Sequence, residues 1–161
     1  EHPKGGIPKM KRHPALVPLS HHHQNALVLA KKLRAANDQT TLEERRSLAK
    51  SVLEFWEGHG RDHFREEEEI LLPIWAKYED PWSAPVEGML RDHIAIRCMV
   101  QTVDAFLAEE NAPETKLLNG LGERLDSHIR LEEHEVFEMA QAAIPEKDLR
   151  RIQELILSFE E

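Results

Sequence analysis

Two histidine–glutamate pairs are the side chains of this sequence best suited to chemistry. His63 precedes Glu67 by four residues, and His128 precedes Glu132 by the same interval. On a helix, residues four apart project from one face, so each pair presents an imidazole beside a carboxylate. Both pairs fall within apolar stripes of helical period, and burying a carboxylate is costly unless it is paired, hydrogen-bonded or bound to a metal. The two pairs therefore predict a metal site.

Two further histidines occupy the middle of apolar stripes in other segments. The stripes are Leu16, Leu19, His23, Leu27 and Ala30 in one segment, and Val86, Leu90, His93, Ile96, Val100, Val103 and Leu107 in the other. Because such stripes face the core of a helical bundle, His23 and His93 are expected to converge with the two pairs. His22 lies on a neighbouring face and is the alternative to His23.

The chain contains an internal repeat of the pattern H-[FI]-R-x-E-E. The pattern occurs at residues 63–68 and again at residues 128–133. A helix pair repeated around a pseudo-two-fold axis places two similar half-sites face to face. Two carboxylates and several imidazoles suit a dinuclear centre of metals of intermediate hardness, with iron preferred to manganese or zinc.

Helices bounded by proline and glycine are expected to position these residues. The predicted helices run from about residues 18–20 to 36, 41 to 78 with a kink at Pro73, 83 to 111, 113 to 142, and 145 to 159. Thr41 and Glu44 have the spacing of a capping box, and Ser83 is a predicted N-cap. The predicted fold is all-α, an up-down-up-down antiparallel four-helix bundle with a short C-terminal helix. Residues 1–13 are predicted to form a flexible tail, and residues 14–161 the bundle domain.

Composition narrows the remaining function classes. The 161 residues include 30 acidic against 21 basic side chains, for a formal charge of -9, which argues against nucleic acid as a partner. Cys98 is the single cysteine, so a disulfide framework and a thiolate-rich zinc site are excluded. We expect no membrane partner and a cytoplasmic location, because the sequence contains no apolar run of spanning length and no signal-like segment at its start.

The order and spacing of these motifs resemble those of bacterial hemerythrin-like proteins, the family of hemerythrin HHE cation-binding domains. The motifs that carry the resemblance are Leu19-Ser20-His21-His22-His23, His59-x3-His63-Phe64-Arg65-x-Glu67-Glu68, Leu71-Leu72-Pro73, Asp92-His93 and His128-Ile129-Arg130-x-Glu132-Glu133. The resemblance implies a non-heme centre of two iron ions. Its implied ligands are His23, His63, Glu67, His93, His128 and Glu132, with the two glutamates bridging the irons.

The sequence departs from oxygen-carrying hemerythrins at one ligand position. Those proteins have two histidines four residues apart on the third helix, where this chain has Met89 before His93. The additional histidine is instead His59, four residues before His63. We therefore predict that His23, His59 and His63 saturate one iron, and that the iron held by His93 and His128 keeps an open position. Alternatives are that His59 only supports or lines the site, and that Glu133 also binds metal.

The expected function is binding of a small ligand, dioxygen, nitric oxide or peroxide, at this centre. Two alternatives remain: an enzyme that consumes peroxide or nitric oxide, and a helical interaction module with a structural metal. Other site types are absent, because the sequence contains neither the Glu-x-x-His spacing of ferritin-like bundles nor the His-Glu-x-x-His of zinc proteases.

Overall fold

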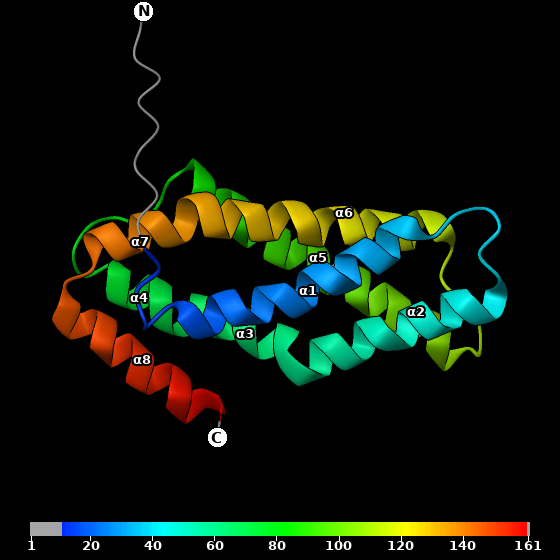
Figure 1. Ribbon diagram of the computed structural model, residues 1–161, viewed down its shortest axis with the longest axis horizontal. Coiled ribbons are helices and arrows are strands. Elements are labelled where there is room, and N and C mark those ends of the chain that lie inside the picture. Colours follow the sequence, from blue (N-terminus) through cyan, green and yellow to red (C-terminus); the bar gives the residue numbers. More distant parts are fainter. Residues whose placement is uncertain (1–10, 161) are drawn as a thin grey trace, which may run out of the picture.

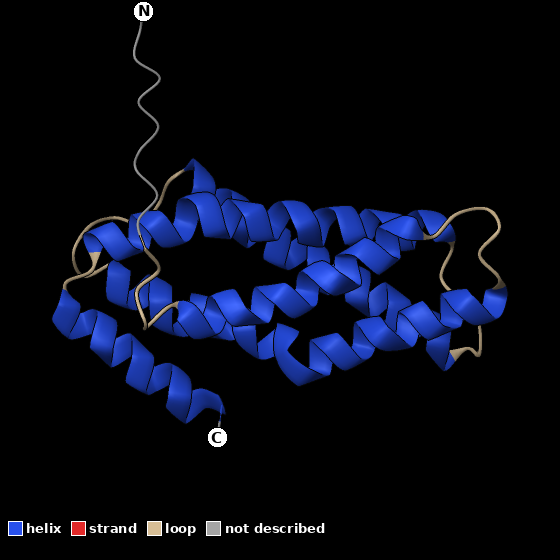
Figure 2. Cartoon of the chain, viewed as in Figure 1, coloured by secondary structure: helices blue, strands red, loops and turns tan. Residues whose placement is uncertain are grey.

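The computed structural model describes residues 11–160, and throughout this range the regular structure is helical (Figure 2). The elements are α1 (Val17–Ala35), α2 (Leu42–Phe55), η1 (Trp56–Gly60), α3 (Arg61–Glu66), η2 (Glu67–Leu71), α4 (Leu72–Trp75), α5 (Ala84–Ala108), α6 (Thr115–Leu131), η3 (Glu132–Val136), α7 (Phe137–Ala143) and α8 (Glu146–Glu160). The segments labelled η are π-helical. No helix of residues 11–160 is long and apolar enough to cross a bilayer.

These elements join into the predicted four-helix bundle (Figure 1). The first rod is α1, the second runs without a break from α2 to α4, the third is α5, and the fourth runs from α6 to α7. The short helix α8 follows and packs against α3 and η2 near one end of the bundle. The prediction of an all-α bundle with a short C-terminal helix is confirmed.

The predicted helix starts are formed by the expected caps. The Thr41 side chain accepts a hydrogen bond from the Glu44 backbone N–H, and the Glu44 carboxylate accepts one from the Thr41 N–H, which completes the capping box. The Ser83 hydroxyl accepts a hydrogen bond from the Val86 N–H. These contacts fix where the second and third rods begin.

The π-helical segments are the feature of the rods that the sequence did not predict. A π segment accommodates one residue more than an α-helical turn, and such segments are frequent at functional sites. Here η2 begins at Glu67 and η3 begins at Glu132. The backbone irregularity therefore occurs at the carboxylate of each histidine–glutamate pair. Pro73 lies within the continuous second rod, just after η2, so its missing N–H falls where the backbone changes from π-helical to α-helical.

Two apolar clusters fill the bundle and leave a polar layer between them. One cluster, toward α4, α7 and α8, includes Leu16, Leu19, Leu71, Trp75, Val86, Met89, Phe137 and Ile152. The other, toward the opposite end, includes Leu29, Leu33, Val52, Ile96, Val100, Leu118, Leu121 and Leu125. On every rod the predicted metal ligands come between residues of the two clusters, so the apolar cores hold the polar layer from both sides.

Residues 11–13, which the sequence assigns to the tail, contact the bundle. Arg12 Nη2 donates to the Glu133 backbone oxygen at 2.8 Å, and the His13 N–H donates to Gln141 Oε1 at 2.8 Å. Residues 1–10, the rest of the predicted tail, lie outside the described residues.

Replacing Gly122 with alanine is expected to destabilise the contact between α1 and α6. A Cβ at this position would lie 2.8 Å from the Ala30 backbone oxygen and 2.9 Å from Leu33 Cβ. Relieving this overlap costs about 1–3 kcal/mol. Gly120→Ala is the matched control, because a Cβ there meets no described atom within 4 Å and alanine favours the helix by about 0.5–1 kcal/mol. Urea unfolding measures both, and a Gly122→Ala variant as stable as the control contradicts the close contact.

Candidate metal centre

Six buried side chains from the four rods meet in the polar layer. They are His23 on α1, His63 on α3, Glu67 at the start of η2, His93 on α5, His128 on α6 and Glu132 at the start of η3. Each is between 0% and 4% exposed. The structure thus brings together six of the seven residues that the sequence predicts as ligands.

The Glu132 carboxylate contacts imidazoles on both sides. Its Oε1 lies 2.8 Å from Nε2 of His128, which is four residues earlier on the same rod. The same oxygen lies 3.1 Å from Nε2 of His23 and 3.7 Å from Nε2 of His63. Glu132 therefore connects the histidines of three rods.

The Glu67 carboxylate has the corresponding position in the second pair. Its Oε1 lies 3.4 Å from Nε2 of His63 and 3.2 Å from Nε2 of His93. Ligand atoms consequently form two overlapping groups, each with all of its atoms within 4.8 Å of one another: His23, His63, Glu67 and Glu132, and Glu67, His93, His128 and Glu132. Two histidines belong to each group alone, and both glutamates belong to both groups.

Outer contacts orient the four imidazoles. In every ring Nε2 faces the centre, and Nδ1 faces a second side chain. The Nδ1 contacts are His23 to Glu133 Oε1 at 2.7 Å, His128 to Asp92 Oδ2 at 3.2 Å, His93 to Glu68 Oε1 at 3.7 Å, and His63 to Nδ1 of His22 at 3.3 Å. The hydrogen bonds of His23, His128 and His63 favour the tautomer that leaves Nε2 available to a metal, whereas Nδ1 of His93 is near Glu68 without a hydrogen bond.

Arginines in turn anchor the three outer carboxylates. Glu133 pairs with Arg12 at 3.1 Å, Asp92 with Arg124 at 3.0 Å, and Glu68 with Arg97 at 2.6 Å. The sequence did not predict Glu68 and Glu133 as outer partners of the histidines. Their signal was available, because each directly follows a glutamate of the repeated histidine–glutamate pairs.

The unpaired polar atoms of this layer fit a bound cation. Both carboxylate oxygens of Glu67, Oε2 of Glu132, both ring nitrogens of His93 and Nε2 of His128 are buried and make no hydrogen bond of acceptable geometry among the described residues, although several of them lie at ion-pair distance from one another. Native proteins rarely leave buried polar atoms unpaired. A cation at the centre would coordinate those of these atoms that face it, so the residues present fit a metal.

Ionisation of the centre also favours cation binding. Burial opposes ionisation of Glu67, but the adjacent His63 and His93 outweigh it and hold the pKa of that carboxyl well below its usual value. Burial lowers the pKa of His23 and of His128 despite their carboxylate partners. Against the effect of burial, Glu67 raises the pKa of His63, and Glu67 and Glu68 raise that of His93. The centre thus offers a charged carboxylate, two imidazoles that favour the neutral form, and two that must release a proton when they bind a metal.

The structure does not bring His59 to the six other side chains. Its exposed ring stacks on His22, with the ring centroids 5.2 Å apart. His59 belongs to the π segment η1, and its ring packs against His22, outside the cluster of six. Between the two alternatives on α1, His23 lies in the centre and His22 lies behind His63.

His22 and His59 line an outer cavity of about 240 Å³ together with Gly58, Asp62, Glu66 and Glu160. Burial and the neighbouring Glu160 raise the pKa of Glu66 to about 8.

A small internal cavity adjoins the centre. Its volume is about 20 Å³, enough for a molecule the size of water. His23, His63, His128 and Glu132 line it on the metal side, and the other lining residues are His22, Ala26, Phe55, Gly60, Phe64, Leu125 and Ile129. His93 does not line it and stacks on Phe64 instead, with the ring centroids 3.9 Å apart.

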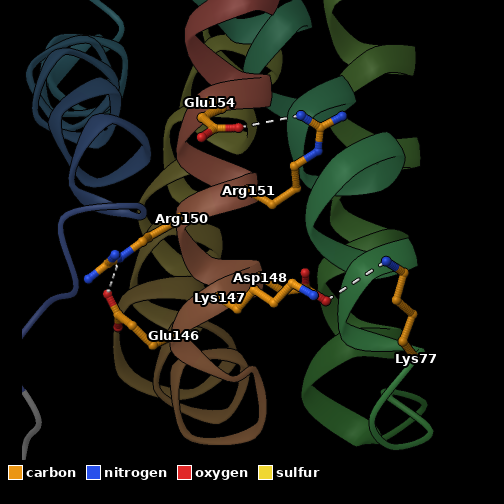
Figure 3. Close-up of a pocket in the computed structure, with 7 residues that line it drawn as sticks. All are labelled: Lys77, Glu146, Lys147, Asp148, Arg150, Arg151 and Glu154. Carbon is orange, nitrogen blue, oxygen red and sulfur yellow. Dashed lines mark hydrogen bonds and ion pairs between the residues drawn. The ribbon is translucent and has the colours of Figure 1, made fainter.

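A wider surface cleft lies between α8 and the segment after α4, and none of the six residues of the centre lines it (Figure 3). Three of its basic side chains pair with acidic ones: Lys77 with Asp148 at 3.8 Å, Arg150 with Glu146 at 3.1 Å and Arg151 with Glu154 at 3.4 Å. These basic and acidic side chains neutralise one another within the cleft. In the centre, by contrast, several buried polar atoms make no hydrogen bond.

Comparison with protein families assigns the chain to a family without using the geometry of the centre. The sequence matches the hemerythrin HHE cation-binding domain over residues 16–140, a range that contains all six residues of the centre. Comparisons with curated proteins and with solved structures gave no significant match. The match covers most of the chain, and its histidines and glutamates form one buried cluster suited to a cation. The chain belongs to the hemerythrin HHE cation-binding domain family.

Proposed function

We propose that this domain holds two iron ions and binds a small ligand beside them. His23 and His63 would hold one ion, His93 and His128 the other, and Glu67 and Glu132 would bridge the two. This assignment is supported by the two overlapping ligand groups that share both glutamates. Nitrogen and oxygen donors in this proportion favour iron, with manganese or zinc as the alternative metals.

The observation that carries the proposed function is the internal cavity at the centre. A volume of about 20 Å³ admits dioxygen, nitric oxide or hydrogen peroxide but no organic substrate. Phe64, Leu125 and Ile129 provide apolar walls that exclude bulk water. When bound, the two irons would supply coordination positions and electrons to such a ligand.

The cavity also indicates the side from which the ligand approaches. It is lined by His23, His63 and His128, and His93 is separated from it by the ring of Phe64. We therefore propose that the ligand binds on the side of the centre that His23, His63 and His128 line. This replaces the sequence-based hypothesis that the open position belongs to the iron of His93 and His128, in which His59 completes the other iron.

The test is to fill this cavity without altering a ligand. Ala26 lines the cavity, so Ala26→Val is expected to leave about two irons per chain and to weaken azide binding by about tenfold or more, because forcing methyl groups into packed space costs about 1–3 kcal/mol. Iron analysis and an azide titration of the visible spectrum measure the two effects. Ala49→Val is the matched control, since Ala49 is buried but does not line the cavity.

Three outcomes decide between the functions. Weaker azide binding in Ala26→Val alone supports a ligand-binding centre. A wild-type spectrum that azide does not change indicates a structural metal. Equal azide affinity in all three proteins means that the ligand reaches the irons by another path and contradicts the role of the cavity.

A further inference from the structure

Acidic side chains predominate in the outer cavity behind the centre. Three carboxylates line it, those of Asp62, Glu66 and Glu160, together with the imidazoles of His22 and His59. No lysine or arginine is among its lining residues. A cavity of this composition attracts a cation.

Glu66 gives this cavity a ligand atom that protein groups do not satisfy. Its side chain is 0% exposed, and neither carboxylate oxygen has a hydrogen-bond partner in residues 11–160. Glu66 lies at the end of α3, on the side that α8 covers. Because a buried carboxyl group without a hydrogen-bond partner is costly, its position between α3 and α8 calls for a partner from outside the chain.

Two more donors complete a compact set around Glu66. Nε2 of His22 lies 3.3 Å from Oε1 of Glu160, and one ligand atom from each of His22, Glu66 and Glu160 falls within 4.8 Å of the others. One imidazole nitrogen with two carboxylate oxygens suits a transition-metal dication, whereas calcium and magnesium prefer oxygen alone. The set joins α1, α3 and α8.

We propose that His22, Glu66 and Glu160 form an outer site for a divalent transition-metal ion, and that the buried centre is loaded from this site. His22 supplies the connection, because it lines both the outer and the inner cavity. Its Nδ1 lies 3.3 Å from Nδ1 of the inner ligand His63. The loading role rests on the proposed dinuclear centre, whereas the outer site itself does not.

The shared contact of His22 makes the outer site the weaker of the two. A neutral imidazole carries one proton, so a metal on Nε2 of His22 leaves that proton on Nδ1. Nδ1 of His63 must also carry a proton when Nε2 of His63 binds a metal, and the two N–H groups would then face each other. Occupation of the inner position therefore favours release of the outer ion, as a loading site requires.

The test uses the metal-free 161-residue chain and Mn²⁺, whose unbound fraction is measured by electron paramagnetic resonance. The wild type is expected to show tight binding at the centre and one weaker class of site. Glu66→Gln should weaken that second class by at least about tenfold and leave the tight class intact. Glu160→Gln provides an independent variant at the exposed end of the site. Glu69→Gln is the control, because Glu69 is an exposed carboxylate of the same rod.

The loading role has its own measurement. The absorption of Co²⁺ as it fills the centre should develop about tenfold more slowly in Glu66→Gln and reach the wild-type amplitude. An unchanged weak class in Glu66→Gln and Glu160→Gln overturns the outer site. Loss of the weak class with unchanged loading overturns the loading role. If tight binding is missing from every protein while the weak class still depends on Glu66, the proposed dinuclear centre fails and the outer site stands.

Discussion

Glu132→Ala is expected to lower the metal affinity of the centre by more than about 100-fold, because losing even an outer partner of a metal ligand costs about 10- to 100-fold. The Glu132 carboxylate lies within 4 Å of Nε2 of His23, His63 and His128 and belongs to both ligand groups. Its removal therefore affects both metal positions at once. Iron analysis of the reconstituted variant should show a sharp loss against about two irons per chain in the wild type.

Two further variants test whether the loss of iron is specific to removal of the Glu132 carboxylate. Glu135→Ala removes an exposed carboxylate from the same π segment and should retain full iron content. Asp92→Asn keeps all six ligands but weakens the partner of His128, so its affinity should fall between the other two. Circular dichroism should show the same helix content in all of them, because the apolar clusters carry the fold. Equal iron content in Glu132→Ala and Glu135→Ala contradicts the assigned centre.

Removal of the metal with a chelator is expected to lower the melting temperature by about 8–16 °C. A metal that binds only the folded state at about 1,000 times its Kd contributes about 4 kcal/mol, and each kcal/mol shifts the melting temperature of a domain of this size by about 2–4 °C. The folded state loses stability because the buried carboxylates and imidazoles no longer have a metal ion to bind. Calorimetry of the iron-loaded and the chelated protein measures the shift.

The same chelator applied to Glu132→Ala separates metal loss from other effects. Since this variant is expected to hold little metal, its melting temperature should barely change on chelation. A wild-type protein that melts at the same temperature with and without metal is inconsistent with coordination inside the bundle. A large shift in the variant shows that the remaining five side chains still bind metal tightly.

The sequence predicted the rods and six residues of the centre because both depend on local spacing. A histidine four residues before a glutamate, within an apolar stripe, is buried on one helical face whatever the details of packing. Thr41 and Ser83 likewise act through neighbours three residues away. Local patterns of this kind can be predicted from the amino-acid sequence alone.

His59 shows where local spacing stops being sufficient. It precedes His63 by four residues, as His63 precedes Glu67, yet only the second interval brings its ends into one cluster. The spacing alone does not reveal that the His59 ring stacks on His22, outside the centre, because that contact joins two rods. Outer partners such as Asp92 depend on contacts between rods, which periodicity does not encode.

The burial of Glu66 is not evident from the sequence for a similar reason. Its neighbours in sequence are acidic, which is typical of a solvated surface, and α8 reaches it from far along the chain. The burial of Glu66 is therefore a property of tertiary packing. Glu66 is covered because the short last helix, α8, packs against α3.

The π segments at Glu67 and Glu132 also bear on how long a bound ion stays. An α-helical ladder interrupted by wider turns opens locally at a lower free energy than the intact helix, and such openings are observed as faster amide hydrogen exchange. At both carboxylates the ladder changes register at the ligand itself. The centre can therefore exchange its metal by a local opening while both apolar clusters remain folded. Residence time of the metal and global unfolding are then governed by separate barriers.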